Sequence, residues 1–513
     1  MVSKVSSIGL SGIDGFVVEV EADVSTGLPV FDIVGLPDNA VKEAKERVRA
    51  AAKNCGFELP NDRITVNLAP ADTKKEGSVF DLPILLCVLK AAGCINVDLS
   101  GCIFAGELSL DGKIRATTGI LPTVLAAKEA GFKKIFVPVS NVQEAAVVEN
   151  VDIYPVFDVV QLLEHLSGRE LISSAPCSLE NIQKEHSSEL LDFADVCGQE
   201  QAKRALEIAA AGAHNILLIG SPGAGKSMLA KRLPSILPPM SIEEAIETTK
   251  IYSVAGLMPK ETSLLLDRPF RAPHHTASKV GLSGGGKTPK PGEISLAHNG
   301  VLFLDELPEF PKSIMEVMRQ PLEDNKVTIS RINSTLTFPC SIMLVCAMNP
   351  CRCGYYGHPT KECRCSQSSV TQYLSKISGP LLDRIDLHIE VPPVEFEELN
   401  KKDEKAETSA QIRERVEKAR EIQRKRYKEY KLHNNAQLPS ALMKEFCKID
   451  KDTETFLKLV FNKLSLSARA YDRILKVSRT IADLEGEESI NASHVSEAIV
   501  YRSLDRKYFS QLR

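Results

Sequence analysis

One short motif constrains the fold of this chain more than any other feature of its sequence. Residues 220–227 match the pattern G-x-x-x-x-G-K-[ST] at every fixed position and follow the apolar run 215–219. The pattern requires a strand, a glycine-rich loop and a helix in that order, because backbone N–H groups and the positive end of the helix must face phosphate oxygens. We therefore expect an α/β fold that binds ATP through the loop residues Gly220, Ser221, Pro222, Gly223, Ala224, Gly225, Lys226 and Ser227. Lys226 is expected to contact the β and γ phosphates, and the Ser227 hydroxyl to bind Mg²⁺.

Two later apolar runs end in side chains that suit nucleotide hydrolysis. Run 301–304 leads into Asp305 and Glu306, and run 341–348 leads into Asn349. The carboxyl ends of parallel strands meet at one edge of a sheet, so these side chains should lie beside the phosphate loop. We expect Asp305 to hold Mg²⁺ through water, Glu306 to polarise the attacking water and Asn349 to position that water.

The composition limits the classes of protein to which the chain can belong. Its 513 residues are 43% hydrophobic and 25% charged, which suits several cores and two or three domains. A net charge of −4 gives no overall basic signature for nucleic acid, so any contact with DNA must be local. No apolar run approaches the ~18 residues of a membrane span, and the start lacks an apolar signal core. We therefore expect a cytoplasmic protein with reduced cysteines and no membrane partner.

Shifts in composition divide the chain into four ranges. Range 1–170 alternates short apolar strands with amphipathic helices, and range 171–190 is a polar linker. Range 191–394 is expected to form the ATPase core, and range 395–513 a helical domain, because no strand is evident there. The expected elements are strands 16–20, 64–68 and 135–139, and helices 39–55, 82–92, 122–130, 409–430, 438–447, 453–463, 468–485 and 492–502.

Four cysteines follow Asn349 in a pattern that suits a metal ion. Cys351 and Cys353 form one C-x-C pair, and after nine intervening residues Cys363 and Cys365 form a second. Four thiolates this close in sequence can fold back into a tetrahedral Zn²⁺ site, with His358 as a substitute ligand. Reduced structural thiols and a redox switch are the alternatives.

Further segments carry a resemblance to a known family. They are the sequences DVCGQ at 195–199, RPFRAPHHT at 268–276, GEISLAHNG at 292–300 and LLDR at 381–384. They look like the magnesium-chelatase-like branch of the AAA+ ATPases, and the whole chain resembles the YifB/ComM family within that branch. The resemblance implies an N-terminal Lon-protease-like (ribosomal S5 domain 2-like) α/β domain, an AAA+ parallel-sheet core and a C-terminal helical lid.

The same resemblance implies a function. Members of the family are expected to form a homohexameric ring that hydrolyses ATP and acts as a DNA helicase. The ring would promote branch migration when incoming single-stranded DNA recombines with the chromosome in natural transformation, with recombination proteins as further partners. Two other functions stay open: a magnesium-chelatase-type motor and a protein-remodelling ATPase.

Two arginines acquire roles only through this resemblance. Arg384 matches the arginine that completes the active site of a neighbouring subunit, and an intramolecular pair with Asp383 or Asp386 is its alternative. Arg469 matches the second sensor, which contacts phosphate from the lid, although Arg473 and Arg479 lie on the same predicted helix.

The first range resembles the Lon protease domain without its catalytic dyad. Alignment on the surrounding residues places Val79 at the nucleophile position and Leu121 at the lysine position. Neither side chain can attack a carbonyl or accept a proton. A shifted dyad of Ser78 and Lys113 is the alternative, and we expect no peptidase activity.

Residues that contact DNA are the least defined part of the sequence. Lys287 and Lys290 lie in a glycine-rich segment, 279–290, that we expect to be a flexible basic loop. Arg331 lies near the turn of a hairpin predicted at 327–339. For both segments a solvated surface loop is an equal alternative. The adjacent pair His274 and His275 is expected to support the core or a subunit interface rather than to bind metal.

Overall fold

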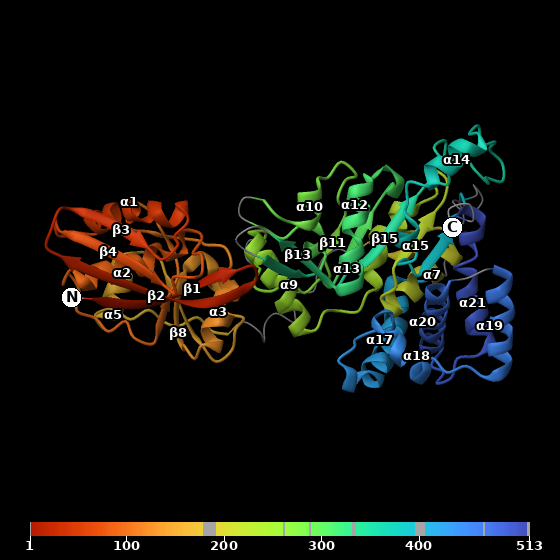
Figure 1. The fold of residues 1–513 in the computed structure, drawn as a ribbon. Coiled ribbons are helices and arrows are strands. Elements are labelled where there is room, and N and C mark those ends of the chain that lie inside the picture. Colours follow the sequence, from red (N-terminus) through yellow and green to blue (C-terminus); the bar gives the residue numbers. More distant parts are fainter. Residues whose placement is uncertain are drawn as a thin grey trace. The chain divides into compact units, whose positions relative to one another are not determined.

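The computed structural model describes residues 2–177, 191–259, 262–286, 289–330, 335–394, 406–464 and 467–509 (Figure 1). The chain forms two compact units, and they do not follow chain order. The first unit comprises Met1–His186, Ile242–Leu266 and Ile332–Phe338. The second comprises Ser187–Ser241, Asp267–Arg331 and Pro339–Arg513.

The first unit is built on a seven-stranded mixed sheet in the order β3-β4-β2-β1-β5-β8-β9. Strand β4 shows why these residues form strands: Ile64, Val66 and Leu68 alternate with more exposed residues, so one face is buried. The strands are β1 (Ser3–Ser11), β2 (Asp14–Ser25), β3 (Val30–Val34), β4 (Arg63–Ala69), β5 (Cys102–Phe104), β8 (Lys134–Pro138) and β9 (Asp152–Val156), with β6 (Glu107–Leu108) and β7 (Ile114–Arg115) in a separate pair. The helices are α1 (Asn39–Asn54), α2 (Asp81–Ala91), α3 (Ile120–Glu129), α4 (Val142–Ala145) and α5 (Val159–Leu166).

Helix α9 (Ile242–Ala255) belongs to the first unit although it follows the phosphate loop in sequence. The Gly119 N–H donates to the carbonyl of Ser253 at 3.1 Å, and the Ser253 hydroxyl donates to the buried carboxylate of Glu144. Burial raises the pKa of Glu144, and the hydrogen bond from Ser253 opposes this rise. The compact units thus divide the chain differently from the contiguous ranges inferred from the sequence.

The second unit contains a five-stranded parallel sheet in the order β11-β12-β15-β10-β16. Both faces of this sheet are covered: Ile216 and Leu218 join one core, and Leu217 and Ile219 join another. The strands are β10 (Ile216–Ile219), β11 (Phe270–Arg271), β12 (Val301–Leu304), β15 (Met343–Met348) and β16 (Leu387–Glu390). The helices around them are α7 (Glu200–Gly212), α8 (Lys226–Arg232), α10 (Lys279–Ser283), α11 (Glu293–Leu296), α12 (Lys312–Val317), α13 (Arg319–Asp324), α14 (Gln367–Leu374) and α15 (Gly379–Leu382).

Helices follow the parallel sheet to the end of the described chain. They are α17 (Ser409–Arg426), α18 (Ser440–Phe446), α19 (Lys451–Leu464), α20 (Ala468–Glu485), α21 (Ala492–Val500) and α22 (Leu504–Phe509). Helix α17 begins with a capping box in which the Thr408 side chain accepts from the N–H of Gln411. The α/β fold class, with a parallel-sheet core and a helical C-terminal region, is confirmed.

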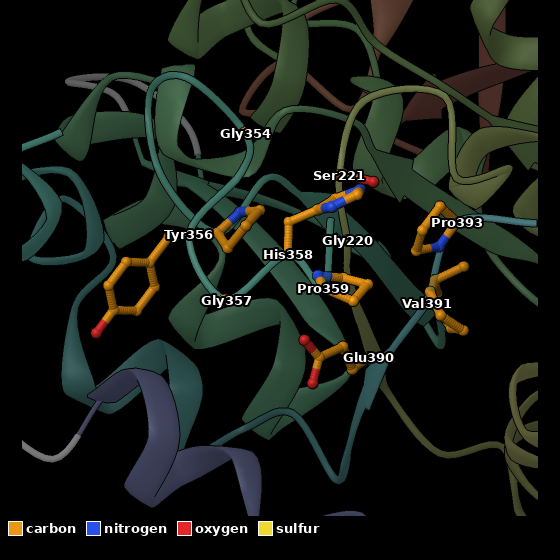
Figure 2. Close-up of a pocket in the computed structure, with 12 residues that line it drawn as sticks. Gly220, Ser221, Gly354, Tyr356, Gly357, His358, Pro359, Glu390, Val391 and Pro393 are labelled. Atoms are coloured by element: carbon orange, nitrogen blue, oxygen red, sulfur yellow. The ribbon is translucent and has the colours of Figure 1, made fainter. Parts of the chain in front are cut away.

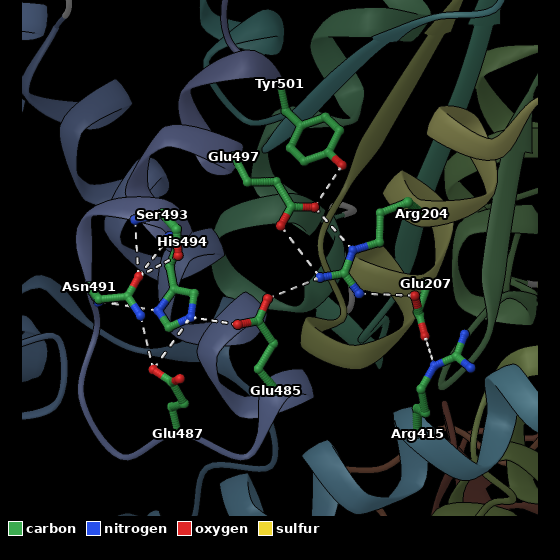
Figure 3. A network of polar contacts seen from close by, with 10 residues as sticks. All are labelled: Arg204, Glu207, Arg415, Glu485, Glu487, Asn491, Ser493, His494, Glu497 and Tyr501. Atoms are coloured by element: carbon green, nitrogen blue, oxygen red, sulfur yellow. Dashed lines mark hydrogen bonds and ion pairs between the residues drawn. The ribbon is translucent and has the colours of Figure 1, made fainter.

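A charged network connects α7 of the sheet layer to the C-terminal helices (Figure 3). Arg204 on α7 donates from Nε to Glu497 on α21 at 3.0 Å and from Nη1 to Glu207 at 3.1 Å. Glu207, whose side chain is 6% exposed, also accepts from Nε of Arg415 on α17 at 2.5 Å. The network is therefore half-buried, and each carboxylate has a cation partner.

Replacing Arg204 by Ala should destabilise the second unit, because Glu207 and Glu497 lose a shared cation. Loss of hydrogen bonds between charged groups costs about 1–3 kcal/mol, and scanning calorimetry would show this as a lower Tm. Arg424→Ala, on the exposed face of α17, is the matched control and should leave the Tm unchanged. An equal Tm for both variants would mean that the network contributes nothing.

Candidate active site

The phosphate loop has the strand–loop–helix geometry that its sequence predicts. Strand β10 leads into the loop, and Gly225 adopts φ +87° immediately before α8 begins at Lys226. This left-handed conformation is strained for a residue with a Cβ atom, which explains glycine at this position. The turn directs the chain into α8 with its first N–H groups facing the loop.

Lys226 connects the phosphate loop to Asn349. Its ammonium group donates to the carbonyl oxygens of Gly220 and Ser221 at 2.8 Å and to Oδ1 of Asn349 at 3.1 Å. Burial lowers the pKa of Lys226, and the carboxylates of Asp305 and Glu306 oppose this effect. The structure thus brings together the three strand ends that the sequence predicts to meet.

The two predicted magnesium ligands are in direct contact. The Ser227 hydroxyl donates to Oδ2 of Asp305 at 2.6 Å, and the other oxygen of Asp305 accepts from the N–H of Glu306 at 2.9 Å. A hydroxyl and a carboxylate are the oxygen donors that Mg²⁺ takes together with water and phosphate oxygens. The residues present therefore fit this ion.

Glu306 lies close to a residue that the sequence did not connect with it. Its backbone lies in the left-handed region at φ +53°, an unfavourable conformation often found at functional sites. Its Oε2 lies 3.5 Å from Nδ1 of His275. His275 follows β11, which pairs with β12, so the order of the sheet brings this histidine beside the acidic strand end. The histidine pair at 274–275 is visible in the sequence, but the pairing of β11 with β12, which brings His275 close to Glu306, is not.

A polar cavity of about 420 Å³ opens beside Glu306 and Asn349. It receives side chains from the turn after β12, from the segment after β15, and from α14 and the residues that follow it. The sequence identified Glu306 and Asn349, whereas the other lining residues carried no recognisable signal: Glu309, Arg352, Tyr373 and Lys376. With carboxylates, cations and an amide in one cavity, this face suits the charged terminal phosphate and the water that attacks it.

A second, smaller hollow of about 70 Å³ lies beside the phosphate loop (Figure 2). Gly220 and Ser221 form part of its wall, and the end of β16 contributes Glu390 and Val391. The remaining wall comes from Pro350, Pro392 and Pro393 and from the segment that contains the four cysteines, through Gly354, Tyr356, Gly357, His358 and Pro359. That segment therefore borders the phosphate loop directly.

The two arginines assigned through the family resemblance have different acidic partners. Arg384 pairs with Glu323, a partner that the sequence did not suggest, and donates from Nη1 to the carbonyl of Pro380 at 2.5 Å. Arg469 lies 4.0 Å from Oδ2 of Asp383, and its side chain is 66% exposed.

The other two arginines considered on α20 form ion pairs with buried carboxylates. Arg473 pairs with the buried carboxylate of Asp386, and Arg479 pairs with Asp483 at 3.1 Å. Both side chains are mostly buried, so Arg469 is the most accessible of these three arginines. Its role as a sensor stays a prediction.

The segments predicted to contact DNA are only partly described. Lys287 and Arg331 lie outside the described residues, and Lys290 is exposed and exchanges backbone hydrogen bonds with Gly285. Residues 279–290 are not the continuous flexible loop expected, because Lys279–Ser283 form α10. The Ser278 side chain caps this helix and Leu282 is buried in the core, which explains the difference. Strands β13 (Lys326–Ser330) and β14 (Thr335–Pro339) pair as the hairpin predicted there.

The first unit shows no sign of a rearranged serine–lysine dyad among its described hydrogen bonds and ion pairs. The Ser78 hydroxyl donates to the carboxylate of Glu107, and Lys113 pairs with Asp111 at 3.3 Å. Leu121, at the position expected for the lysine, is fully buried. The absence of peptidase activity stays a prediction.

The fold and the site together define a class of protein. A phosphate loop, an acidic strand end and an asparagine on the intervening parallel strand are the parts of an AAA+ ATPase. Residues 192–399 match the family model for magnesium chelatase, subunit ChlI, residues 20–141 match that for subunit ChlI of Mg-chelatase, and residues 406–502 match that for its C-terminal region.

Comparison with individual proteins identifies the family. The chain is 45% identical to competence protein ComM of Haemophilus influenzae and 41% identical to YifB of Escherichia coli, in each case over 96% of both chains. It is also 26% identical to the Lon protease of Mycolicibacterium smegmatis over 31% of this chain and 22% of that protein. The chain therefore belongs to the YifB/ComM family of magnesium-chelatase-like AAA+ ATPases, with an N-terminal Lon-like domain. Among the described residues, no helix is both long and apolar enough to cross a membrane.

Replacing Glu306 by Gln should stop turnover and preserve ATP binding. The amide keeps the size of the side chain but cannot take a proton from water, so the turnover number should fall by about 10²-fold or more. Steady-state hydrolysis and equilibrium binding of a fluorescent ATP analogue would separate the two effects. Lys226→Ala should lose binding or hydrolysis, and undiminished turnover in Glu306→Gln would refute the assignment of Glu306 as the base.

Replacing His275 by Ala should lower the turnover number by roughly tenfold with little change in KM for ATP, because Glu306 loses the imidazole that lies 3.5 Å from its carboxylate. His274→Ala is the matched control, since that ring lies beside His275 with centroids 4.0 Å apart and an interplanar angle of 34°, and it hydrogen-bonds Thr276 rather than Glu306. Parallel changes in KM for both variants would indicate a general packing role rather than positioning of Glu306.

Proposed function

We propose that this protein is an ATP-driven DNA motor that promotes branch migration during recombination of incoming DNA. The observation that carries the proposal is the 45% identity to a competence protein across 96% of both chains. The assembled contacts of Lys226, Ser227 and Asp305 support it, because a motor needs a complete hydrolytic site.

The proposed mechanism places ATP between neighbouring subunits of a homohexameric ring. Lys226 contacts the β and γ phosphates, and Glu306 polarises water that Asn349 positions. Ser227 and Asp305 hold Mg²⁺, which neutralises phosphate charge as the bond breaks. All of these residues lie in the second unit.

The arginines connect hydrolysis to movement in this proposal. Arg384 leaves Glu323 and contacts the γ phosphate held by the next subunit, where its guanidinium stabilises developing charge. Arg469 contacts phosphate from the lid in the same subunit. Lid movement then shifts the segments around Lys287, Lys290 and Arg331, which contact single-stranded or branched DNA through its phosphates.

The proposal also assigns roles to the four ranges of the chain. The ranges 1–170, 171–190, 191–394 and 395–513 act as Lon-like scaffold, linker, ATPase core and lid. The protein works in the cytoplasm without a membrane partner, and recombination proteins are its expected partners. Besides ATP and Mg²⁺, a zinc ion is bound by Cys351, Cys353, Cys363 and Cys365.

The family models favour one competing function. Their names refer to magnesium chelatase subunits, so a chelatase-type motor is the second candidate, and a protein-remodelling ATPase is the third. Neither requires DNA to stimulate hydrolysis. Dependence on DNA therefore separates the proposed function from both.

The deciding experiment measures ATP hydrolysis with single-stranded, duplex and branched DNA, beside unwinding of a forked or three-stranded substrate. We expect DNA to stimulate hydrolysis several-fold, because DNA bound in the ring should favour the conformation in which the nucleotide sites hydrolyse ATP. We also expect unwinding by the unmodified protein and none by Lys226→Ala. Hydrolysis that is indifferent to all three DNAs would contradict the proposal and favour a chelatase-type or protein-remodelling ATPase.

A further inference from the structure

The sulfur atoms of Cys351, Cys353, Cys363 and Cys365 converge on one point. All four Sγ atoms lie within 4.8 Å of one another. Cys351 Sγ is 3.3 Å from Cys353 Sγ and 3.7 Å from Cys363 Sγ, and the last two are 3.6 Å apart. Four sulfurs at about 2.3 Å from a tetrahedral zinc ion lie about 3.8 Å from one another. The distances among Cys351, Cys353 and Cys363 agree with this value, and the Cys365 sulfur lies within 4.8 Å of the other three.

The cysteines are not explained by a disulfide, although Cys351 lies in an apolar core and the other three pack against that core. A disulfide needs an S–S distance of about 2.05 Å, and all four cysteines are free. Cys351 is buried, whereas the other three are half-buried. Neutral thiols are weak donors and weak acceptors, so burial against that core does not by itself require four sulfur atoms to meet at one point.

The segment that carries them has little other structure to hold it. Residues 351–365 are all described, and none belongs to a helix or a strand. Gly354 at φ +84° and Gly357 at φ +77° turn the chain between the two C-x-C pairs. Ordering fifteen residues without regular structure is unfavourable in entropy, and a metal ion bound by both ends offsets that cost.

This segment, which we call the cysteine loop (residues 351–365), packs against the phosphate loop. A Cβ atom built on Gly354 would lie 2.3 Å from Cδ and 2.6 Å from Cγ of Pro222. The backbone of the cysteine loop is therefore in contact with the middle of the phosphate loop. Figure 2 shows Gly354, Tyr356 and Gly357 of the cysteine loop bordering the same hollow as Gly220 and Ser221.

The cysteine loop also borders the hydrolytic side of the site. Cys351 follows two residues after Asn349, which accepts a hydrogen bond from Lys226. Arg352, between the first two cysteines, lines the polar cavity with Glu306. A ligand that fixes the cysteine loop thus constrains both the phosphate loop and the residues around the attacking water.

We propose that Cys351, Cys353, Cys363 and Cys365 bind one Zn²⁺ ion, and that this ion holds the cysteine loop against Pro222 so that ATP hydrolysis depends on zinc. Four soft thiolates in tetrahedral arrangement select zinc over magnesium, which binds oxygen ligands. The dependence of hydrolysis on zinc rests on the proposed ATPase function, whereas the metal site does not.

Metal analysis tests the first half of the inference without reference to activity. Protein purified without chelator should contain about one zinc ion per chain, and replacement by cobalt should give the thiolate charge-transfer absorption of a tetrahedral site. Cys353→Ser combined with Cys363→Ser should lose the metal, whereas Cys94→Ser in the first unit should keep it. Less than about half an equivalent of zinc in the unmodified protein, or iron in its place, would overturn the metal site.

A pair of glycine variants tests the second half while all four cysteines are kept. Gly354→Ala inserts a methyl group toward Pro222, whereas at Gly357 the nearest atom to an added Cβ is Cε of Lys507 at 3.7 Å. Both positions have a left-handed φ, so the backbone strain is matched. Gly354→Ala should retain zinc and lose roughly tenfold in turnover number, or in nucleotide affinity, relative to Gly357→Ala.

Removal and return of the ion completes the test. Zinc withdrawn by a chelator under reducing conditions should abolish most hydrolysis, and added Zn²⁺ should restore it. Equal activity of the two glycine variants, or full activity of the zinc-free protein, would overturn the coupling. A chain that holds zinc but neither binds nor hydrolyses ATP would instead contradict the proposed function, so the two failures are distinguishable.

Discussion

The order of the parallel sheet is the constraint on which the rest of the site depends. Strand β15 lies between β10 and β12, so the phosphate loop, the acidic pair and Asn349 leave the same edge of the sheet as neighbours. Because all three strands run in parallel and are buried on both faces, their ends cannot shift without exposing a core. The contact between Lys226 and Asn349 follows from that order, and so does the position of the cysteine loop, which starts where β15 ends.

The parts of the site that could be predicted are those encoded by local pattern. A buried strand followed by a glycine-rich turn or by two carboxylates has the same appearance in any fold of this class, and the geometry of Ser227 and Asp305 agrees with it. Helix α20 also has the predicted bounds, because Ser467 caps its start, Gly486 ends it and its apolar residues recur at helical spacing. Where backbone chemistry and hydrophobic period agree over a short stretch, sequence is sufficient.

The parts that could not be predicted depend on partners distant in sequence. His275 becomes relevant to Glu306 only because β11 pairs with β12, and no local pattern specifies that pairing. Helix α9 was assigned to the ATPase range by continuity of sequence, yet Ser253 donates to Glu144 of the first unit. The charges that line the polar cavity come from three separate segments, and each segment alone is an ordinary polar turn or helix.

The contacts of Arg384 within one chain bear on the proposed ring. Its side chain is 11% exposed and pairs with Glu323, whose side chain is 53% exposed. An exposed carboxylate contributes little to a pair because water competes for it, whereas a γ phosphate bound between subunits carries more charge and is shielded from water. In the proposed ring, exchange of Glu323 for the phosphate of a neighbour would therefore be favourable only when that neighbour holds ATP. The interface between subunits of the proposed ring would then be sensitive to the nucleotide. Hydrolysis would remove the γ phosphate, and Arg384 would pair with Glu323 again.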